Sequence, residues 1–383
     1  MVPDQADVDI SDYLKLMPEK NASDLFFSTG APVNIKIEGV TSAVDDRRLA
    51  PGEVKSIAYS LMSDAQTSEF EHGMEMDLAV SVRGVGRFRV NVFRQRGEVS
   101  MVVRYIKSRV AGITELNLPP ILQDLVMEPR GMVLVVGTTG SGKSTTLAAM
   151  LSHRNRNKTG HILTIEDPIE YIHEHDKSVV NQREVGLDTL SYAHALKRAM
   201  REAPDVIMIG EIRDRETLEQ AISYAETGHL CLSTMHVNNA NQTLERIVNF
   251  FPDTAHHELY MDLSLNLRAI IAQRLVIGKD GLRVPAVEIL LSSSYVQELI
   301  QKGEIDTIKD AMEQSSDRGM QTFDQALYGL YADGKITMEE ALRNADSRNN
   351  LSLRIRLAQT GSAEGSGDFA IGDGFGDDIG VLR

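Results

Sequence analysis

The residues best suited to chemistry in this sequence form a glycine-rich segment. It runs Gly137-Thr138-Thr139-Gly140-Ser141-Gly142-Lys143-Ser144 and has the spacing G-x-x-x-x-G-K-[ST], directly after the apolar run Met132–Val136. Glycines let successive backbone N–H groups turn toward phosphates, and the N-terminus of a following helix attracts negative charge. The segment therefore predicts a nucleotide phosphate site at residues 137–145, with Thr145 at its end.

Two side chains of this segment would contact the nucleotide directly. Lys143 would reach the β and γ phosphates of ATP, and the hydroxyl of Ser144 would ligate Mg²⁺. The alternative is a glycine-rich turn that binds nothing. The complete spacing, between a buried strand and a helix, favours the phosphate site.

Carboxylates after neighbouring apolar runs narrow the choice of enzyme. Val206–Ile209 is followed by Gly210-Glu211, so a glutamate stands where an aspartate usually ends this strand. At the ligand edge of a doubly wound sheet, Glu211 would hold Mg²⁺ through water, although strand-end glutamates are often only solvated. No Asn-Lys-x-Asp sequence is present to recognise guanine, which disfavours a GTPase.

These segments resemble the PilT/GspE family, the ATPases of type II secretion and type IV pilus systems. Thr164–Tyr171 is similar to the acidic box of the family, the Gly-Glu pair to its atypical Walker B motif, Thr227–His236 to its histidine box and Arg87–Asn91 to its arginine segment. The four boxes occur in the family's order. The resemblance covers most of the chain, from about Asp24 to Ala345.

The resemblance implies roles for individual residues. Glu170, the second glutamate of the acidic box, would orient and polarise the attacking water. His236 would sense the γ phosphate or couple subunits. His229, at the other end of the same strand, is a further candidate, and its alternative role is purely structural. For the acidic box, the alternative is that Glu166, Asp167 and Glu170 only cap the turn that follows.

Arginines outside the P-loop segment form a further group of candidates. By resemblance, Arg89 and Arg104 of the first domain would contact the nucleotide and stabilise charge on the transferring phosphoryl group. The alternative is that they are exposed cationic side chains on strands and do not contact the nucleotide. Arg198 and Arg201 would be interface residues or only the solvated face of a helix.

The family also implies an assembly, a direction of work and partners. It forms homo-hexameric rings in which domain closure acts on an inner-membrane pilus platform protein. Extension motors carry an extra N-terminal domain and a tetracysteine zinc element, but this chain has one cysteine, Cys231, so we expect a retraction motor of twitching motility. The segments Asn238–Gln242 and Tyr295–Ile300 and the acidic tail favour an accessory motor that works beside a PilT-type motor. Thr138 replaces a common proline.

Three alternatives to retraction remain. An extension or secretion ATPase would share the same boxes, a catalytically weak nucleotide-binding scaffold would stabilise a partner motor, and a RecA-like motor would move DNA. A net charge of −15 disfavours the last, because non-specific nucleic-acid affinity depends on Lys and Arg, so no nucleic-acid partner is expected.

The elements that must position these residues form an α/β protein. Residues 1–109 predict a PAS-like mixed domain, with strands at Val33–Ile37, Asp77–Val82, Arg87–Phe93 and Val99–Ile106 and a helix at Glu53–Glu69. Residues 110–120, with the Pro119-Pro120 pair, predict a linker. A RecA-like ATPase domain with C-terminal helices would occupy residues 121–358, and an acidic, glycine-rich, disordered tail would occupy 359–383.

Within the ATPase domain, short continuous apolar runs predict strands buried on both faces, as in a parallel sheet. They lie at Met132–Val136, Ile162–Ile165, Val206–Ile209 and Leu230–Thr234, with helices at Tyr192–Glu202 and Glu216–Glu226. After Pro252 we expect a mainly helical bundle, beginning with Glu258–Leu275 and continuing with Ser294–Gln301, Ile305–Gln314, Thr322–Ala332 and Met338–Ala345.

The sequence shows neither an apolar run near the ~18 residues of a membrane span nor a basic, then apolar leader. We therefore expect a cytoplasmic protein that acts at the cytoplasmic face of the inner membrane through the pilus base.

Overall fold

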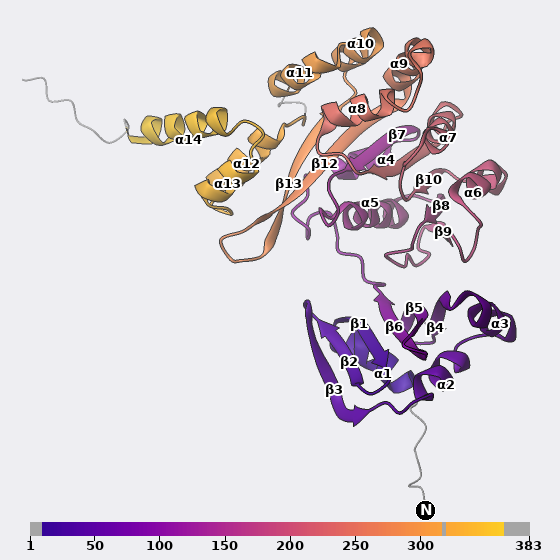
Figure 1. Cartoon of the computed structure of the whole chain (residues 1–383). Helices are drawn as coiled ribbons and strands as arrows, with labels where there is room; N and C mark the ends of the chain where they lie inside the picture. Colours follow the sequence, from indigo (N-terminus) through magenta and orange to yellow (C-terminus); the bar gives the residue numbers. More distant parts are fainter. Residues whose placement is uncertain (1–9, 316–318, 364–383) are drawn as a thin grey trace, which may run out of the picture.

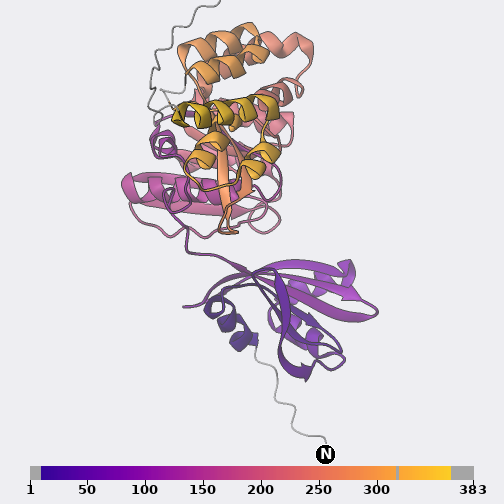
Figure 2. The same cartoon turned by 90° about the vertical axis from the view of Figure 1, so that its left-hand side faces the viewer.

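The computed structural model describes residues 10–315 and 319–363. They form two lobes, each with its own sheet and core, joined by an extended connection (Figures 1 and 2). The first lobe is mixed α/β with an antiparallel sheet, and the second has a mainly parallel sheet flanked by helices. The predicted α/β fold class is therefore confirmed.

The first lobe is built from a six-stranded antiparallel sheet in the order β3-β2-β1-β6-β5-β4. Alternating apolar side chains such as Phe88, Val90 and Val92 of β5 pack into its core. Its elements are α1 (Ile10–Glu19), β1 (Ala22–Ser28), β2 (Pro32–Ile37), β3 (Val40–Arg48), α2 (Glu53–Ser60), α3 (Asp64–Gly73), β4 (Glu75–Val82), β5 (Gly86–Gln95) and β6 (Glu98–Ile106).

The single helix predicted at Glu53–Glu69 is wrong, because two helices occupy this region. α2 ends at Ser60, and α3 begins after Ser63. Ser63 and Gln66 form a capping box, in which each side chain bonds the backbone N–H of the other residue. Such a box satisfies N–H groups that an interrupted helix would leave without partners, and it starts a new helix.

The second lobe is built on a seven-stranded sheet in the order β13-β12-β7-β11-β10-β8-β9. Six strands run parallel, and β13 pairs antiparallel with β12. Its elements as far as the sheet extends are α4 (Ile121–Met127), β7 (Gly131–Val136), α5 (Lys143–Asn157), β8 (Gly160–Glu166), β9 (Ser178–Glu184), α6 (Tyr192–Ala199), the 3₁₀ turn Met200–Glu202, β10 (Val206–Ile209), α7 (Arg215–Glu226), β11 (Leu230–Met235), α8 (Ala240–Val248), the 3₁₀ turn Asp253–Ala255, α9 (His256–Asn266), β12 (Leu267–Ile277) and β13 (Arg283–Leu291).

The central strands of this sheet are apolar along their whole length because helices cover both faces. Leu134 and Val136 of β7 belong to the core shared with α6 to α9. Val133 and Val135 point the other way, into the core shared with α4 and α5. The two faces therefore belong to two cores, as expected for a parallel sheet between helical layers.

The helix predicted at Glu258–Leu275 is wrong in its second half. α9 ends at Asn266, and the chain continues as β12, which pairs with β7 in the centre of the lobe. The following strand, β13, was also missed. The run from Ala269 to Ile277 is rich in apolar and β-branched residues, and the pairing with β7 made it a strand.

The remaining helices form a C-terminal layer. They are α10 (Ser294–Lys302), the 3₁₀ turn Ile305–Thr307, α11 (Ile308–Gln314), α12 (Phe323–Ala332), α13 (Met338–Asn344) and α14 (Arg348–Ala363). α14 continues to Ala363, so the tail predicted from residue 359 is wrong for its first five residues, and residues 364–383 lie outside the described part. No helix within the described residues has the length and apolar character needed to span a bilayer.

Candidate nucleotide-binding site

The glycine-rich segment forms a loop between β7 and α5, the arrangement predicted for it. Gly137, Gly140 and Gly142 have φ values of 153°, 79° and 92°, which L side chains rarely adopt. A Cβ on Gly137 would lie 2.4 Å from Ser141 Oγ, and one on Gly142 would lie 2.7 Å from Gln273 Nε2. Only glycine fits the tight turn at these positions.

Polar groups inside the loop fit a phosphate ligand. Lys143 Nζ donates to the carbonyl oxygens of Gly137, at 2.8 Å, and Thr138, at 3.0 Å. Burial lowers the pKa of Lys143, and the nearby Glu211 carboxylate opposes this shift. Ser141 Oγ is buried and has no hydrogen-bond partner among the described residues. A phosphate oxygen would accept from this hydroxyl, and phosphate charge would favour the ammonium form of Lys143.

A cavity of about 340 Å³ opens beside the loop, at the carboxyl ends of the parallel strands. This edge is where open α/β sheets bind ligands. Of the predicted residues, those that line the cavity are Thr139, Gly140, Lys143, Ser144, Glu166, Asp167, Glu170, Glu211 and His236. The structure thus brings together three boxes that are far apart in the sequence.

Glu211 lies at the centre of a polar cluster. Arg213 Nε donates to Glu211 Oε2 at 2.8 Å, and His236 Nε2 lies 3.4 Å from Glu211 Oε1. His236 Nδ1 also lies 3.5 Å from the hydroxyl of Thr139 in the phosphate loop. His236 thus contacts both the loop and the carboxylate expected near Mg²⁺, which suits a residue that responds to the γ phosphate.

The residues suited to Mg²⁺ are few. Among residues 10–315 and 319–363, no group of three or more His, Cys, Asp or Glu side chains is arranged to hold a metal ion. Ser144 and Glu211 both line the cavity and both offer oxygen. Mg²⁺ usually keeps several waters and binds protein through one or two oxygens together with substrate phosphates, so this pair fits Mg²⁺ that arrives with ATP.

The acidic box contains two glutamates in contrasting environments. Glu166 is buried and accepts hydrogen bonds from Thr164 Oγ1, at 2.6 Å, and Gln182 Nε2, at 3.1 Å. Burial raises the pKa of Glu166 to about 7. Glu170 is exposed and lines the cavity. Glu166 is held in place by its neighbours, whereas Glu170 is accessible to a ligand and to water.

Three of the predicted catalytic residues lie away from the cavity. Arg89 pairs with Glu184 at 3.3 Å, and Arg104 pairs with Asp24 at 2.8 Å. His229 lies just before β11, at the end of the strand opposite His236, where its Nδ1 lies 3.2 Å from the carbonyl oxygen of Tyr224. In the described part of the chain, none of these three side chains lines the cavity.

Two contacts that the sequence did not predict hold the first turn of α5, directly after the phosphate loop. Thr146 Oγ1 donates to Gln273 Oε1 at 2.6 Å, and the Tyr171 hydroxyl lies 2.9 Å from Thr145 Oγ1. Gln273 is buried in β12. Because β12 was predicted to be a helix, its position beside the loop could not be foreseen. A polar glutamine inside the apolar run Ala269–Ile277 was the available signal.

The fold, the phosphate loop and the two carboxylates of Glu170 and Glu211 beside it define a P-loop ATPase. The family model described as "Type II/IV secretion system protein" matches residues 7–280. The chain belongs to this family, as its boxes predicted.

Particular relatives are more similar still. The chain is 51% identical to the type IV pilus ATPase PilU of Pseudomonas aeruginosa, over 92% of each chain. It is 41% identical to the type IV pilus retraction ATPase PilT of the same organism, over 90% of this chain and all of PilT. A crystal structure of the pilus retraction motor PilT with bound ADP superposes with a TM-score of 0.83 at 42% identity, covering 89% of this chain and 98% of that one.

Proposed function

We propose that this chain hydrolyses Mg·ATP to drive type IV pilus retraction. The observation that carries the proposal is the cavity, in which an intact phosphate loop meets Glu170, Glu211 and His236 in a chain similar to PilU and PilT along nearly its whole length. A scaffold that only bound nucleotide would have no need of the two accessible carboxylates beside Lys143.

Each residue of the cavity has a distinct task in this proposal. Backbone N–H groups of residues 137–145 and Lys143 Nζ bind the phosphates, while Ser144 and Glu211 hold Mg²⁺, which neutralises charge on the phosphates. Glu170 orients the attacking water and accepts its proton as the bond to phosphorus forms. Glu166, which Thr164 and Gln182 hold in place, fixes the position of the acidic box at the edge of the cavity.

The contacts between the two lobes provide a route from chemistry to movement. The backbone of Lys107, just after β6, accepts from Ile172 N at 3.0 Å, next to the tyrosine that contacts Thr145 of α5. Arg89 of the first lobe pairs with Glu184 of the second. γ-Phosphate contacts made in one state and lost in the other would shift these links, with residues 110–120 as the hinge between domains at 1–109 and 121–358.

The arginines have their proposed roles in the closed state. Arg89 and Arg104 would contact nucleotide when the first domain of the same or a neighbouring subunit closes over the site. His229 would hold the start of β11 and so fix the strand that carries His236. In this proposal the Arg89 side chain leaves Glu184, its ion-pair partner, and binds a phosphate of the nucleotide on closure.

We further propose a homo-hexamer that works as a PilU-like accessory to a PilT-type motor. It would act on the inner-membrane pilus platform protein, at the cytoplasmic face of that membrane. The higher identity to PilU than to PilT supports the accessory role.

A deletion strain tests the cellular proposal. Deletion is expected to leave pili on the surface and to reduce twitching, and the loss should deepen when a PilT-type motor is also impaired. Complementation with the wild-type gene should restore movement, and complementation with Glu170→Gln should not. Loss of surface pili on deletion would contradict retraction and would favour an extension motor.

A further inference from the structure

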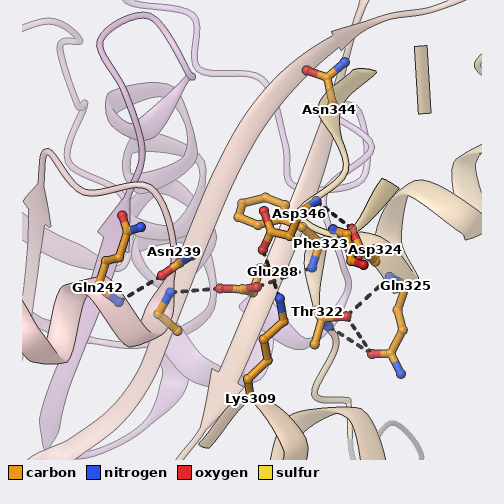
Figure 3. Close-up of polar contacts among 12 residues, drawn as sticks. Asn239, Gln242, Glu288, Lys309, Thr322, Phe323, Asp324, Gln325, Asn344 and Asp346 are labelled. Carbon is orange, nitrogen blue, oxygen red and sulfur yellow. Dashed lines mark hydrogen bonds and ion pairs between the residues drawn. The ribbon is translucent and has the colours of Figure 1, made fainter. Parts of the chain in front are cut away.

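A buried carboxylate outside the nucleotide site joins the starts of two helices. Glu288 of β13 is 3% exposed. Its Oε1 accepts from the backbone N–H of Ala240 at 2.8 Å, and its Oε2 accepts from the backbone N–H of Phe323 at 3.3 Å. Figure 3 shows Glu288 between these two chain segments, with Lys309 and Asp346 beside it. Ala240 is the first residue of α8, and Phe323 is the first residue of α12.

These two helix starts belong to different parts of the molecule. α8 begins four residues after His236, which lies in the nucleotide cavity, and Asn239 caps it through Gln242 N. α12 belongs to the C-terminal layer and begins with a capping box formed by Thr322 and Gln325. Each helix already has its own N-cap. The Glu288 carboxylate is an additional acceptor that serves both starts at once.

The strands that carry Glu288 also contact the phosphate loop. Ala272 of β12 pairs with Glu288, and the next residue, Gln273, pairs with Val287. Successive side chains of a strand point to opposite faces, so Gln273 reaches Thr146 of α5 while Glu288 reaches α8 and α12. One two-stranded unit therefore contacts the phosphate loop on one face and both helix starts on the other.

Charged groups from the surrounding elements also face Glu288. A cavity of about 270 Å³ contains Glu288 together with Glu245 of α8, Lys309 of α11 and Asp346, which follows α13. Asp346 pairs with Arg274 of β12 at 2.7 Å and with Lys309 at 3.4 Å. Burial raises the pKa of Glu288 to about 7; Asp346 adds to the rise, while the two N–H bonds and Lys309 oppose it.

We propose that Glu288 is a positioning residue that couples the chain segment after His236 to the C-terminal helices. When nucleotide moves His236, the first turn of α8 moves with it. Glu288, bonded to both helix starts, carries that displacement to α12. The inference rests on the proposed binding of nucleotide beside His236, and it identifies the route by which the cavity communicates with the C-terminal layer.

Protonation changes how well Glu288 can make this link. A carboxylate offers a full acceptor oxygen to each N–H, whereas a carboxylic acid keeps one good acceptor and turns the other oxygen into a donor. The link is therefore stronger at pH 8 than at pH 6, because the pKa of Glu288 is raised to about 7. Glu288→Gln keeps the size of the side chain and one acceptor oxygen, so the link between the two helix starts should be weakened at every pH.

Hydrogen exchange on the full-length protein tests the coupling. Exchange of the backbone amides is measured with and without Mg·ADP at pH 6 and pH 8, corrected for the intrinsic exchange rate. In the wild type at pH 8, nucleotide should slow exchange at residues 137–145, 239–242 and 322–325. In Glu288→Gln the change at 322–325 should shrink at least about threefold while the change at 137–145 remains.

A matched variant and the pH series complete the test. Glu340→Gln changes another carboxylate that accepts a backbone N–H, that of Ile277, but has no bond to α8, and it should leave the response at 322–325 intact. Because the pKa of Glu166 at the cavity lies in the same range, the response at 322–325 is taken relative to that at 137–145. This ratio should fall in the wild type between pH 8 and pH 6, so the test stands even if Glu288→Gln folds poorly. An undiminished response at 322–325 both in Glu288→Gln and in the wild type at pH 6 would overturn the coupling. Unchanged exchange at 137–145 in the wild type would instead overturn nucleotide binding, and the coupling with it.

Discussion

The nucleotide cavity is one polar site of the second lobe, and the contact of Glu288 with Ala240 and Phe323, here named the Glu288 junction, is another. The two sites are built in opposite ways. The cavity draws its side chains from short continuous motifs, each at the carboxyl end of one parallel strand. The junction joins β13 to the starts of α8 and α12, which lie far apart in the sequence and share no motif. Chemistry is thus encoded locally in this chain, whereas communication depends on how the elements pack.

The same contrast separates two buried glutamates whose pKa values are both raised to about 7 by burial. Glu166, which lines the cavity, is held by the side chains of Thr164 and Gln182 and by the backbone of Glu170 in the same box. Glu288 is held by two backbone N–H groups. Substitution at Glu166 should therefore act on the local acidic box, and substitution at Glu288 should act between elements.

The largest effect that separates the two regions is expected from Lys143→Ala. Removing the ammonium group deprives the phosphates of a charge that no other group of the loop supplies. We expect ATP turnover to fall at least about 100-fold, the usual cost of losing one group that stabilises transition-state charge. Steady-state phosphate release at saturating Mg·ATP measures the loss. Lys309→Ala, at the junction, is the control and should keep most of the turnover.

The two histidines at opposite ends of β11 test how local the chemistry is. His236→Ala should lower ATP turnover about 10-fold, because His236 lies 3.4 Å from Glu211 and 3.5 Å from Thr139, and a net hydrogen bond contributes about 1 kcal/mol. His229→Ala should leave turnover within about twofold. Equal losses of turnover in the two variants would show that both histidines act by stabilising β11, and that contact of His236 with the cavity has no effect of its own.

Gln273→Ala should have a smaller effect of mixed character. It leaves the buried Thr146 hydroxyl without its partner, at a cost of about 1–3 kcal/mol, and it removes support behind Gly142. We expect a lower melting temperature and a KM for ATP raised a few-fold. Mg·ADP should recover part of the lost melting temperature, since ligand that binds only the folded state stabilises it. A stability loss with unchanged KM would limit Gln273 to a structural role.

The smallest effect on turnover is expected from Glu166→Gln, which should instead change how stability depends on pH. The folded pKa of Glu166, about 7, lies above the ordinary value of 4.5, so the stability that protonated Glu166 provides is complete below pH 4.5 and is lost as pH rises through 7. The variant should gain stability relative to the wild type between pH 5 and pH 8, by at most on the order of 3 kcal/mol. Thermal unfolding of both proteins at the two pH values measures it. A constant difference would contradict the raised pKa.

The sequence predicted the cavity better than it predicted the junction, for physical reasons. The phosphate loop needs glycines at fixed positions and a lysine after them, so its residues identify it without reference to the fold. Glu211 followed from the strand before it, and Glu170 from the resemblance of its segment to the acidic box of the family. Arg89 and Arg104 could not be placed, because their partners Glu184 and Asp24 depend on long-range packing.

The C-terminal part shows where prediction from the sequence failed. The run after Asn266 mixes helix formers with β-branched residues, and pairing with β7 turned it into β12. The error at β12 concealed the position of Gln273, and the separate failure to predict β13 concealed that of Glu288. The break at Ser63 was visible in principle, since serine followed three residues later by glutamine is the pattern of a capping box.

ATP turnover by Glu170→Gln tests the central claim most directly. Glutamine keeps the size of the side chain but cannot accept the proton of the attacking water. Glu166→Gln, measured beside it, is the control for the same substitution at the other glutamate of the box. The account predicts a loss of about 100-fold or more in Glu170→Gln, with Mg·ATP still bound, and a much smaller loss in Glu166→Gln. Undiminished turnover in Glu170→Gln, or the larger loss in Glu166→Gln, would contradict it.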